Sequence, residues 1–329
     1  MLQVARAAGV HQSTVSLALR GSSRISAATT EKVCRTAQKM GYRPNPLVSA
    51  LVASRKRRAP VARATMGYVI GDDSGQPWPY KQLDEGIYQR AAELGYRIDR
   101  LPLGRDAIYG DRFAQVAQTR DIHGLIIAPL FRKQITLALP WERFAAVAYG
   151  YFVEQPSIHR VTPDFFRSMI DLLAHVRQAG WSRVGLILNT NKRSKDHLWL
   201  AAFLAEQRIS AKFGRIPPLL LPVWSASQAD AWFRRHRPEA VISLYSLLRP
   251  AEDLFKVGMT GIPLPRWYCL DIAPGDRSVN YPGVVINRAE CGRACVDILA
   301  DLLNRNQIGI PARAHHTFIE TEWRDGSET

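Results

Sequence analysis

Residues 4–53 read VARAAGVHQSTVSLALRGSSRISAATTEKVCRTAQKMGYRPNPLVSALVA, and this stretch decides the fold of the N-terminal part of the chain. Its apolar residues recur at helical spacing in three short segments and then in a fourth, even shorter one. The first two predicted helices run from Leu2 to Ala8 and from Gln12 to Leu19. Gly9 lies at the corner between them, where a residue without a Cβ can adopt a positive φ. The spacing therefore predicts a helix-turn-helix.

The second predicted helix has two unlike faces. At about 100° per residue, Val15, Ala18 and Leu19 fall on one side, which is predicted to pack against the other helices. The opposite side carries Ser13, Ser16, Leu17 and Arg20. An apolar Leu17 among polar residues suits a helix that lies in the major groove of DNA, where it can contact a thymine methyl group. The alternative is that Leu17 covers the edge of a small core.

A third helix is predicted to follow Ser26, because serine is a preferred N-cap residue. Its buried stripe would consist of Val33, Ala37 and Met40, and the helix would end at Gly41. Together with the first two segments, this helix completes a three-helix unit.

A fourth helix is predicted over residues 46–53, since Asn45 and Pro46 form an N-cap and first-turn pair. Its apolar residues make two rows at i, i+4 spacing, Leu47/Leu51 and Val48/Val52. An isolated helix of this length is not stable in water. The two rows therefore need partners, which a symmetric copy of the chain and the minor groove of DNA would supply.

These motifs resemble the DNA-binding headpiece of the lactose/galactose repressor (LacI/GalR) family. The family pattern is matched by Val4-Ala5, Ala8-Gly9-Val10, Ser13-Thr14-Val15-Ser16, Ser26 to Thr29 to Val33, and Tyr42 to Asn45. In that family the second helix reads the major groove, and a leucine of a hinge helix inserts into the central minor groove. The resemblance implies a helix-turn-helix headpiece over residues 1–44, followed by a hinge helix and basic linker over residues 45–63.

The resemblance also assigns roles in DNA binding to individual residues. It gives base reading to Gln12, Ser13 and Leu17, and minor-groove insertion to Leu51. It gives phosphate positioning to Ser16, Tyr42 and Asn45. The same elements contribute the remaining DNA-binding candidates, Thr14, Arg20 and Val48.

The headpiece departs from the family pattern in three places. Leu17 stands where many members have arginine, so a bidentate guanine contact is lost and the operator half-site is expected to differ. Val48 replaces the usual alanine of the hinge helix, which affects how closely that helix approaches the minor groove. The chain starts at Met1-Leu2, a few residues short of the usual start of the first helix, so either this helix frays or the natural start lies upstream.

The charge of the chain is concentrated at the same end. The 329 residues carry a net charge of +15, and residues 1–63 contain twelve Lys or Arg and one acidic residue, a net charge of +11. Residues 55–63, RKRRAPVAR, form a basic, proline-containing run that reads as a solvated linker and also as a segment near phosphate. Double-stranded DNA is the expected partner of this end, with an affinity that falls steeply with salt.

The composition argues against membrane and metal-binding classes. No apolar run approaches the roughly 18 residues of a membrane span, and no signal-peptide pattern is present, so we expect a cytoplasmic chain with no membrane partner. The four cysteines, Cys34, Cys269, Cys291 and Cys295, fit no zinc spacing with histidine and are predicted to be buried, reduced thiols. Cys291 and Cys295, at i, i+4, could supply two metal ligands, but no third converges with them. We expect no metal and no cofactor.

From Thr65 onward, short apolar runs alternate with amphipathic helices, which predicts an α/β fold with doubly wound parallel sheets. The first round contains strands in MGYVIG, YRIDRLPL, HGLIIAPL and AAVAYGYF, with helices over residues 80–94, over residues 112–119 and near residue 141. The second contains RVGLILN, PPLLLPVW, AVISLYSL and RWYCLDI, with helices over residues 164–179, 195–207, 226–236 and 290–304. Residues 64–329 resemble the bilobed, periplasmic-binding-protein-like effector and dimerisation domain of the same family.

In open α/β sheets, ligands bind beyond the carboxyl ends of the strands. The residues there are Asp72, Phe131, Tyr149, Asn189, Tyr245 and Asp271. Carboxylates and amides mixed with aromatic rings are typical of a sugar site. The resemblance adds Asp164 and Trp199 as effector-binding candidates. Each residue also has a structural alternative, as an N-cap, a turn residue or a core aromatic.

Two of these positions depart from the family. Trp199 stands where the family commonly has an arginine, and Leu244-Tyr245-Ser246 replaces a common Ala-Asn-Asp. These changes remove usual polar contacts to a sugar. They leave open a less typical or more apolar ligand, or none.

The resemblance implies a homodimeric transcriptional regulator, a repressor, that binds a pseudo-palindromic operator and is controlled by a small-molecule effector, a sugar or sugar derivative, between two lobes. The alternative is an unregulated or architectural DNA-binding protein whose body only dimerises. The sequence has no nucleophile elbow, P-loop or dinucleotide fingerprint, so an enzyme is not expected.

Overall fold

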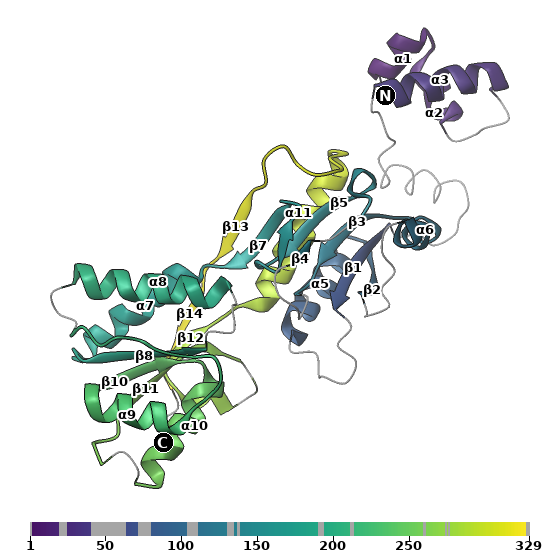
Figure 1. Cartoon of the computed structure of the whole chain (residues 1–329). Helices are drawn as coiled ribbons and strands as arrows, with labels where there is room; N and C mark the ends of the chain where they lie inside the picture. The colour runs from purple at the N-terminus through teal and green to yellow at the C-terminus, as the bar shows by residue number, and fades with distance from the viewer. Residues whose placement is uncertain are drawn as a thin grey trace.

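A computed structural model gives the structure of the chain. It describes residues 2–19, 25–40, 64–71, 80–103, 111–129, 135–136, 139–189, 194–210, 214–258, 261–273, 275 and 277–326. These residues form a helical headpiece and two α/β lobes (Figure 1). The hinge helix and basic linker predicted over residues 45–63 lie outside the described residues.

The headpiece consists of α1 (Leu2–Ala8), α2 (Gln12–Ala18) and α3 (Ala27–Lys39), as the sequence predicts. Gly9 adopts a φ of +65° at the corner after α1, and Ser26 caps α3 by accepting a hydrogen bond from the amide of Thr29. The buried core is made of small and β-branched side chains, namely Val4, Ala5, Ala8, Val15, Ala18, Val33 and Ala37. The placement of Met40 in this core is wrong. Met40 is 45% exposed, because it is the C-cap of α3 and its backbone has left the helix.

The first lobe is built on a parallel sheet. Its strands are β1 (Thr65–Gly71), β2 (Arg97–Leu103), β3 (Ile122–Ile127), β5 (Ala145–Tyr149), β7 (His159–Pro163) and β13 (His316–Ile319). The described strands lie in the order β13-β7-β5-β3-β1-β2, and each neighbouring pair is parallel. α5 (Lys81–Glu93) and α11 (Arg288–Asn304) cover one face, and α6 (Asp111–Thr119) covers the other.

The second lobe repeats this plan with a different last strand. Its strands are β8 (Val184–Asn189), β9 (Leu219–Leu221), β10 (Ala240–Ser243), β11 (Arg266–Ile272), β12 (Gly283–Val285) and β14 (Glu322–Arg324). They lie in the order β14-β12-β11-β10-β8-β9, and only β14 is antiparallel to its neighbour among these described strands. α7 (Phe165–Gln178) and α8 (Ser194–Ile209) pack on one face, and α9 (Ala226–His236) and α10 (Tyr245–Lys256) pack on the other.

Both sheets read as continuous apolar runs because helices cover both of their faces. The central strands β8 and β10 are buried along almost their whole length. The predicted α/β architecture with two doubly wound parallel sheets is confirmed by this arrangement.

The assignment of the last helix to the second lobe is wrong. α11 begins at Arg288 and packs into the core of the first lobe through Cys291, Cys295, Val296 and Leu299. Its backbone runs very close to α5, since a Cβ added to Gly86 would lie 1.9 Å from the carbonyl oxygen of Ala289. The chain crosses back to the first lobe just before α11, and the order of elements in the sequence does not reveal that crossing.

Three segments connect the lobes. The chain leaves the first lobe after β7, returns after β12, and crosses again between β13 and β14 (Figure 1). β13 then adds an edge strand to the first sheet and β14 adds one to the second. The sequence predicts none of the strands β7, β13 and β14, because they are short and no more than half of the residues of β13 and β14 are apolar.

Several smaller features differ from the predictions. The helix expected near Trp141 is a short 3-10 helix, η1 (Trp141–Arg143), and a second one, η2 (Arg277–Asn280), follows β11. The strand in AAVAYGYF stops at Tyr149 because Gly150 turns the chain with a φ of +71°. A separate parallel pair joins β4 (Ile135–Thr136) to β6 (Val153–Gln155).

The described helices include none that is long and apolar enough to cross a membrane. Cys269, Cys291 and Cys295 are buried free thiols, as predicted. Cys34 is exposed on α3, so its predicted burial is wrong. The buried stripe of α3 passes through Val33 and Ala37, and Cys34 points away from it.

Candidate functional site

The outer face of α2 is the candidate DNA-reading surface. Gln12 and Ser13 are exposed, and Thr14 and Leu17 are half-buried. His11, which sequence reasoning missed, is the N-cap of α2, and its Nδ1 accepts hydrogen bonds from the amide and the hydroxyl of Ser13. Histidine is a less common N-cap residue than serine or aspartate, so His11 is only a weak sequence signal for this role.

Leu17 does not join the headpiece core. The partly buried apolar side chains that pack against that core, within the described part of the headpiece, are Val10, Leu19 and Ile25. This favours an outward role for Leu17 over the alternative of covering the core edge.

The other DNA-binding candidates are not tested by the structure. Ser16 lies within α2, but its side chain is outside the description. The remaining candidates lie outside the described residues, namely Arg20, Tyr42, Asn45, Val48 and Leu51.

A second candidate site lies where the carboxyl ends of the two sheets meet. Tyr149 is the last residue of β5 in the first lobe, and Asp271 lies near the end of β11 in the second. Arg288, the first residue of α11, lies between them. Tyr80, the N-cap residue of α5, lies beside Tyr149. We call Tyr80, Tyr149, Asp271 and Arg288 the interlobe cluster.

The geometry of this cluster centres on one ion pair. Nη2 of Arg288 donates to both carboxylate oxygens of Asp271, at 2.8 Å and 2.6 Å. The two side chains are only 13% and 12% exposed. The rings of Tyr80 and Tyr149 meet edge to face, with centroids 6.1 Å apart. The ion pair between Arg288 and Asp271 therefore joins the two lobes through charged groups that are largely removed from water.

The pKa shifts in the cluster fix its protonation states. Burial raises the pKa of Tyr149 well above its ordinary value, and nearby Cys291, Tyr80 and Asp271 raise it further, against the opposing effect of Arg288. Burial works to lower the pKa of Arg288, but Asp271 and the two tyrosines outweigh it and raise that pKa. Arg288 is therefore a cation and Tyr149 a neutral phenol near neutral pH. Because both Tyr149 and Asp271 act on the pKa of Arg288, both lie close to its guanidinium.

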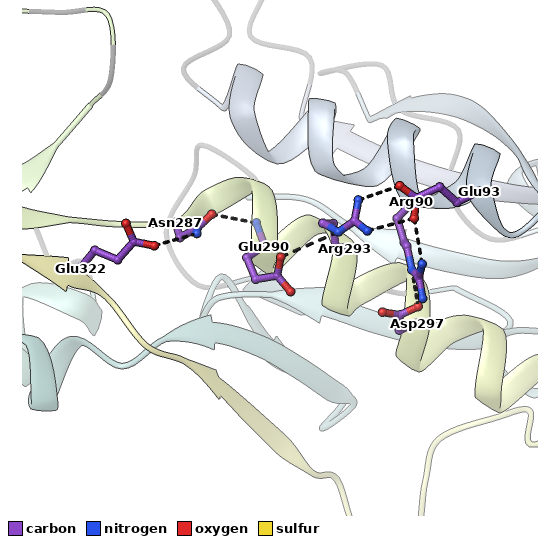
Figure 2. Close-up of polar contacts among 7 residues, drawn as sticks. All are labelled: Arg90, Glu93, Asn287, Glu290, Arg293, Asp297 and Glu322. Carbon is purple, nitrogen blue, oxygen red and sulfur yellow. Dashed lines mark hydrogen bonds and ion pairs between the residues drawn. The ribbon is translucent and has the colours of Figure 1, made fainter.

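Helix α11, which begins at Arg288, is joined to α5 by a network of charged side chains (Figure 2). Arg293 donates to both oxygens of Glu93, at 3.0 Å and 2.9 Å. Arg90 of α5 donates to Glu93 at 2.8 Å and to Asp297 of α11 at 2.7 Å. The hydrogen bonds from Arg293 and Arg90 lower the pKa of Glu93 to about 2. The two helices are thus joined by charged groups as well as by close backbone packing.

The start of α11 is also tied to the second lobe. Oδ1 of Asn287 caps the helix by accepting from the amide of Glu290, at 3.0 Å. Its Nδ2 donates to Glu322 of β14, at 3.4 Å (Figure 2). The hydrogen bond from Asn287 to Glu322 and the ion pair of Arg288 with Asp271 therefore join the start of this helix to the second lobe through two consecutive residues.

The structure brings together two of the eight predicted effector-binding residues, Tyr149 and Asp271. Arg288 and Tyr80 were missed by sequence reasoning. The short run Gly283–Ile286 before Asn287 is the signal that could have marked Arg288 as following another strand end. Asp72 and Phe131 lie outside the described residues.

Trp199 is a core residue, and its prediction as an effector contact is wrong. Its side chain is 0% exposed, and its ring packs edge to face on Phe165. Its Nε1 donates to the hydroxyl of Ser168 at 3.0 Å. The position faces the layer between α8 and α7, so no ligand reaches it.

The other three candidates have local roles. Asp164 caps α7 by accepting from the amide of Arg167, which is the structural alternative foreseen for it. Asn189 ends β8 and is partly exposed. Tyr245 starts α10, contacts the ring of Tyr281 and lines a surface cavity of about 700 Å³ beside that helix, away from the interlobe cluster.

No group of three or more metal-ligating side chains occurs among the residues that the structure describes. The interlobe cluster consists of one ion pair and two tyrosine side chains.

Comparisons with known proteins bear on both sites. Residues 1–45 match the model of the bacterial regulatory proteins of the lacI family. The transcriptional regulator DegA of Bacillus subtilis is 30% identical over 125 residues, and the maltose regulon regulatory protein MalI of Escherichia coli is 33% identical over 128 residues. Each match covers 38% of this chain and 34% of the relative, so the similarity spans about a third of those proteins.

The fold is similar to solved structures over nearly the whole chain. A complex of the transcriptional regulator CelR with cellobiose has a TM-score of 0.57 at 18% identity, covering 97% of this chain and 96% of that one. The Lac repressor dimer bound to operator and the anti-inducer ONPF has a TM-score of 0.56 at 16% identity, covering 98% and 96%. Residues 1–45 are therefore similar to the regulatory proteins of the lacI family, and nearly the whole chain shares the fold of these two solved structures.

Proposed function

We propose that this chain is a sequence-specific DNA-binding transcriptional regulator, a repressor, that binds a pseudo-palindromic operator as a homodimer. A small-molecule effector, a sugar or sugar derivative, would control it from the interlobe cluster. The observation that carries the DNA-binding part is the outer face of α2, where Gln12 and Ser13 are exposed and Leu17 stays out of the core.

Charge supports the same assignment. Residues 1–63 hold +11 of the net charge of +15, so the headpiece end is the part of the chain that attracts a polyanion. We propose residues 1–44 as the headpiece, residues 45–63 as hinge helix and linker, and residues 64–329 as the effector-binding and dimerisation domain. Leu51 of the hinge would then insert into the minor groove, with ordering of the hinge as part of the binding free energy.

The effector part of the proposal is supported by the position of the interlobe cluster. Its residues lie at the carboxyl ends of both sheets, the place where open α/β sheets bind ligands. A ligand held there contacts both lobes at once and so favours one lobe orientation. That orientation would alter how well two hinge helices can form together in a dimer, which is a population shift. Catalysis forms no part of this proposal.

The decisive experiment is a selection of binding sites from random duplex DNA with the full chain, followed by fluorescence anisotropy on the selected sequence. We expect a pseudo-palindromic consensus, and an affinity that falls at least about 1000-fold as salt rises from about 50 mM to about 200 mM. Leu17→Arg should change the base preferred in each half-site, because arginine donates to guanine where leucine contacts a methyl group. Gln38→Ala, an exposed change on α3, is the matched control and should keep the consensus.

Two outcomes would count against the proposal. A selection without any consensus would favour the architectural alternative. The same consensus for wild type and Leu17→Arg would remove Leu17 from base reading.

A further inference from the structure

The interlobe cluster is rich in hydrogen-bond donors, and its one carboxylate is already engaged. Both oxygens of Asp271 accept from Nη2 of Arg288, at 2.8 Å and 2.6 Å. A neutral polyol is best held by acceptors that take its hydroxyl protons, and Asp271 is the carboxylate that would do this here. Since Arg288 takes one acceptor site on each of these oxygens, Asp271 has fewer sites left for the hydroxyl groups of a neutral sugar.

Arg288 meets Asp271 through only one of its nitrogens. Nη2 donates both bonds, so the pair lacks the two-nitrogen fork that arginine forms with a carboxylate at full strength. Within the part of the chain that the structure describes, no hydrogen bond involves Nε or Nη1 of Arg288. The N–H groups of Nε and Nη1 lie on different edges of the guanidinium, and each of these nitrogens can still donate to a second anion.

Other groups around Arg288 favour negative charge as well. Arg288 is the first residue of the 17-residue helix α11, whose N-terminus carries a partial positive charge. Tyr149 remains protonated, since its pKa is raised by burial, and its hydroxyl can therefore donate. The guanidinium is 13% exposed, and a largely desolvated cation gains more from an anionic ligand than a cation in water does.

From this arrangement we infer that the effector carries an anionic group, a carboxylate or a phosphate, and that Arg288 is the residue that determines this specificity. The inference rests on the proposed function, because it names the ligand class of the proposed effector site. Asp271 acts as an internal counter-ion that holds Arg288 until the ligand arrives.

Isothermal titration calorimetry on the full chain tests the inference with matched compounds. Galactose, galacturonate and galactose 6-phosphate form one set, and glucose, glucuronate and glucose 6-phosphate form another. We expect at least one anionic member to bind tenfold or more tightly than its neutral parent. The comparison of the uronate with the phosphate within a set identifies which anion the cluster accepts.

Variants then assign the preference to Arg288. Arg288→Gln should reduce the affinity for the anionic compound to that of the neutral parent. Arg305→Gln removes an exposed arginine that pairs with Asp301 at the other end of α11, and it should leave binding unchanged. If Arg288→Gln does not fold, the double variant Asp271→Asn with Arg288→Gln removes both charges together and should show the same loss of preference.

Asp271→Asn gives the sharpest contrast. As an internal counter-ion, Asp271 competes with the ligand, so its neutralisation should tighten anion binding by about three- to tenfold. A direct hydroxyl acceptor would give the opposite result, with binding weakened.

The inference is overturned if neutral sugars bind as tightly as their anionic counterparts, if the anion preference survives Arg288→Gln, or if Asp271→Asn weakens binding. A silent titration with every compound overturns it too. If a neutral sugar regulates the protein, this inference fails but the proposed function stands. If the selection finds no DNA consensus, the proposed function fails, and that result does not depend on Arg288.

Discussion

The first and second lobes have sheets of the same size and similar strand order, but they draw on the chain differently. The second lobe is almost continuous, from Asp164 to Ile286, and adds only β14 from outside that range. The first lobe combines residues 64–163 with α11 and β13, which come from the far end of the chain. The lobe nearer the N-terminus is therefore completed by C-terminal residues. The helices α5 and α11, which pack together in its core, lie far apart in the sequence.

This difference explains how one helix can serve two purposes. α11 packs against α5 in the core of the first lobe, while its first residue pairs with Asp271 of the second. A helix anchored in one lobe and paired to the other at its tip responds to any change in their relative orientation. The helix that joins the lobes is therefore built into the core of the first lobe and contacts the second lobe through its first residue.

The largest expected effect tests the close packing of α5 on α11. In Gly86→Ala, the new Cβ would lie 1.9 Å from the carbonyl oxygen of Ala289, so the two helices must separate. We expect a loss of about 3 kcal/mol or more in the free energy of unfolding, measured by urea denaturation. Gly214→Ala in the second lobe is the matched control, because its Cβ would make only an ordinary contact at 3.6 Å. Equal effects of the two substitutions would mean that the helices are not this close.

A smaller loss is expected on breaking the ion pair between the lobes. Asp271→Ala leaves the guanidinium of Arg288 largely buried without its partner, at a cost of about 2 kcal/mol. Removing both charges in Asp271→Ala with Arg288→Met should recover most of that loss, which a double-mutant cycle in thermal unfolding measures. Additive losses would show that the pair does not couple the lobes.

The smallest expected effect concerns the pH dependence of the contact between α5 and α11. The pKa of Glu93 is lowered from 4.5 to about 2, so the folded state binds this proton less readily than the unfolded state. The stabilisation is complete above pH 4.5 and is lost as the pH falls toward 2. The difference in Tm between wild type and Glu93→Gln should therefore be greatest above that window and vanish near its lower end. A difference that does not change with pH would remove Glu93 from the acid response.

The sequence predicted the headpiece well because its signals are local. Helix spacing, the N-cap at Ser26 and the positive φ at Gly9 all depend on neighbouring residues, and each of these features is confirmed. The alternation of apolar runs and helices likewise predicted both parallel sheets. Errors in these local features include the exposed Met40 at the C-cap of α3 and the exposed Cys34 within that helix.

Long-range features could not be predicted in the same way. The lobe to which α11 belongs depends on a crossing after β12, and its apolar face would suit either core. At the candidate effector site, the expectation that ligands bind beyond the carboxyl ends of strands identified Tyr149 and Asp271. It could not predict that Arg288 would form an ion pair with Asp271. The prediction for Trp199 was wrong for a related reason, because the side of α8 on which Trp199 lies packs against α7.

The late position of β13 and β14 in the chain bears on biosynthesis. Each of them completes one sheet by pairing with an edge strand, β7 or β12. During translation, both edges stay unpaired until every other described element has been made, and an unpaired edge is a template for association with other chains. We therefore expect these two edges to be sites of such association until β13 and β14 have been made.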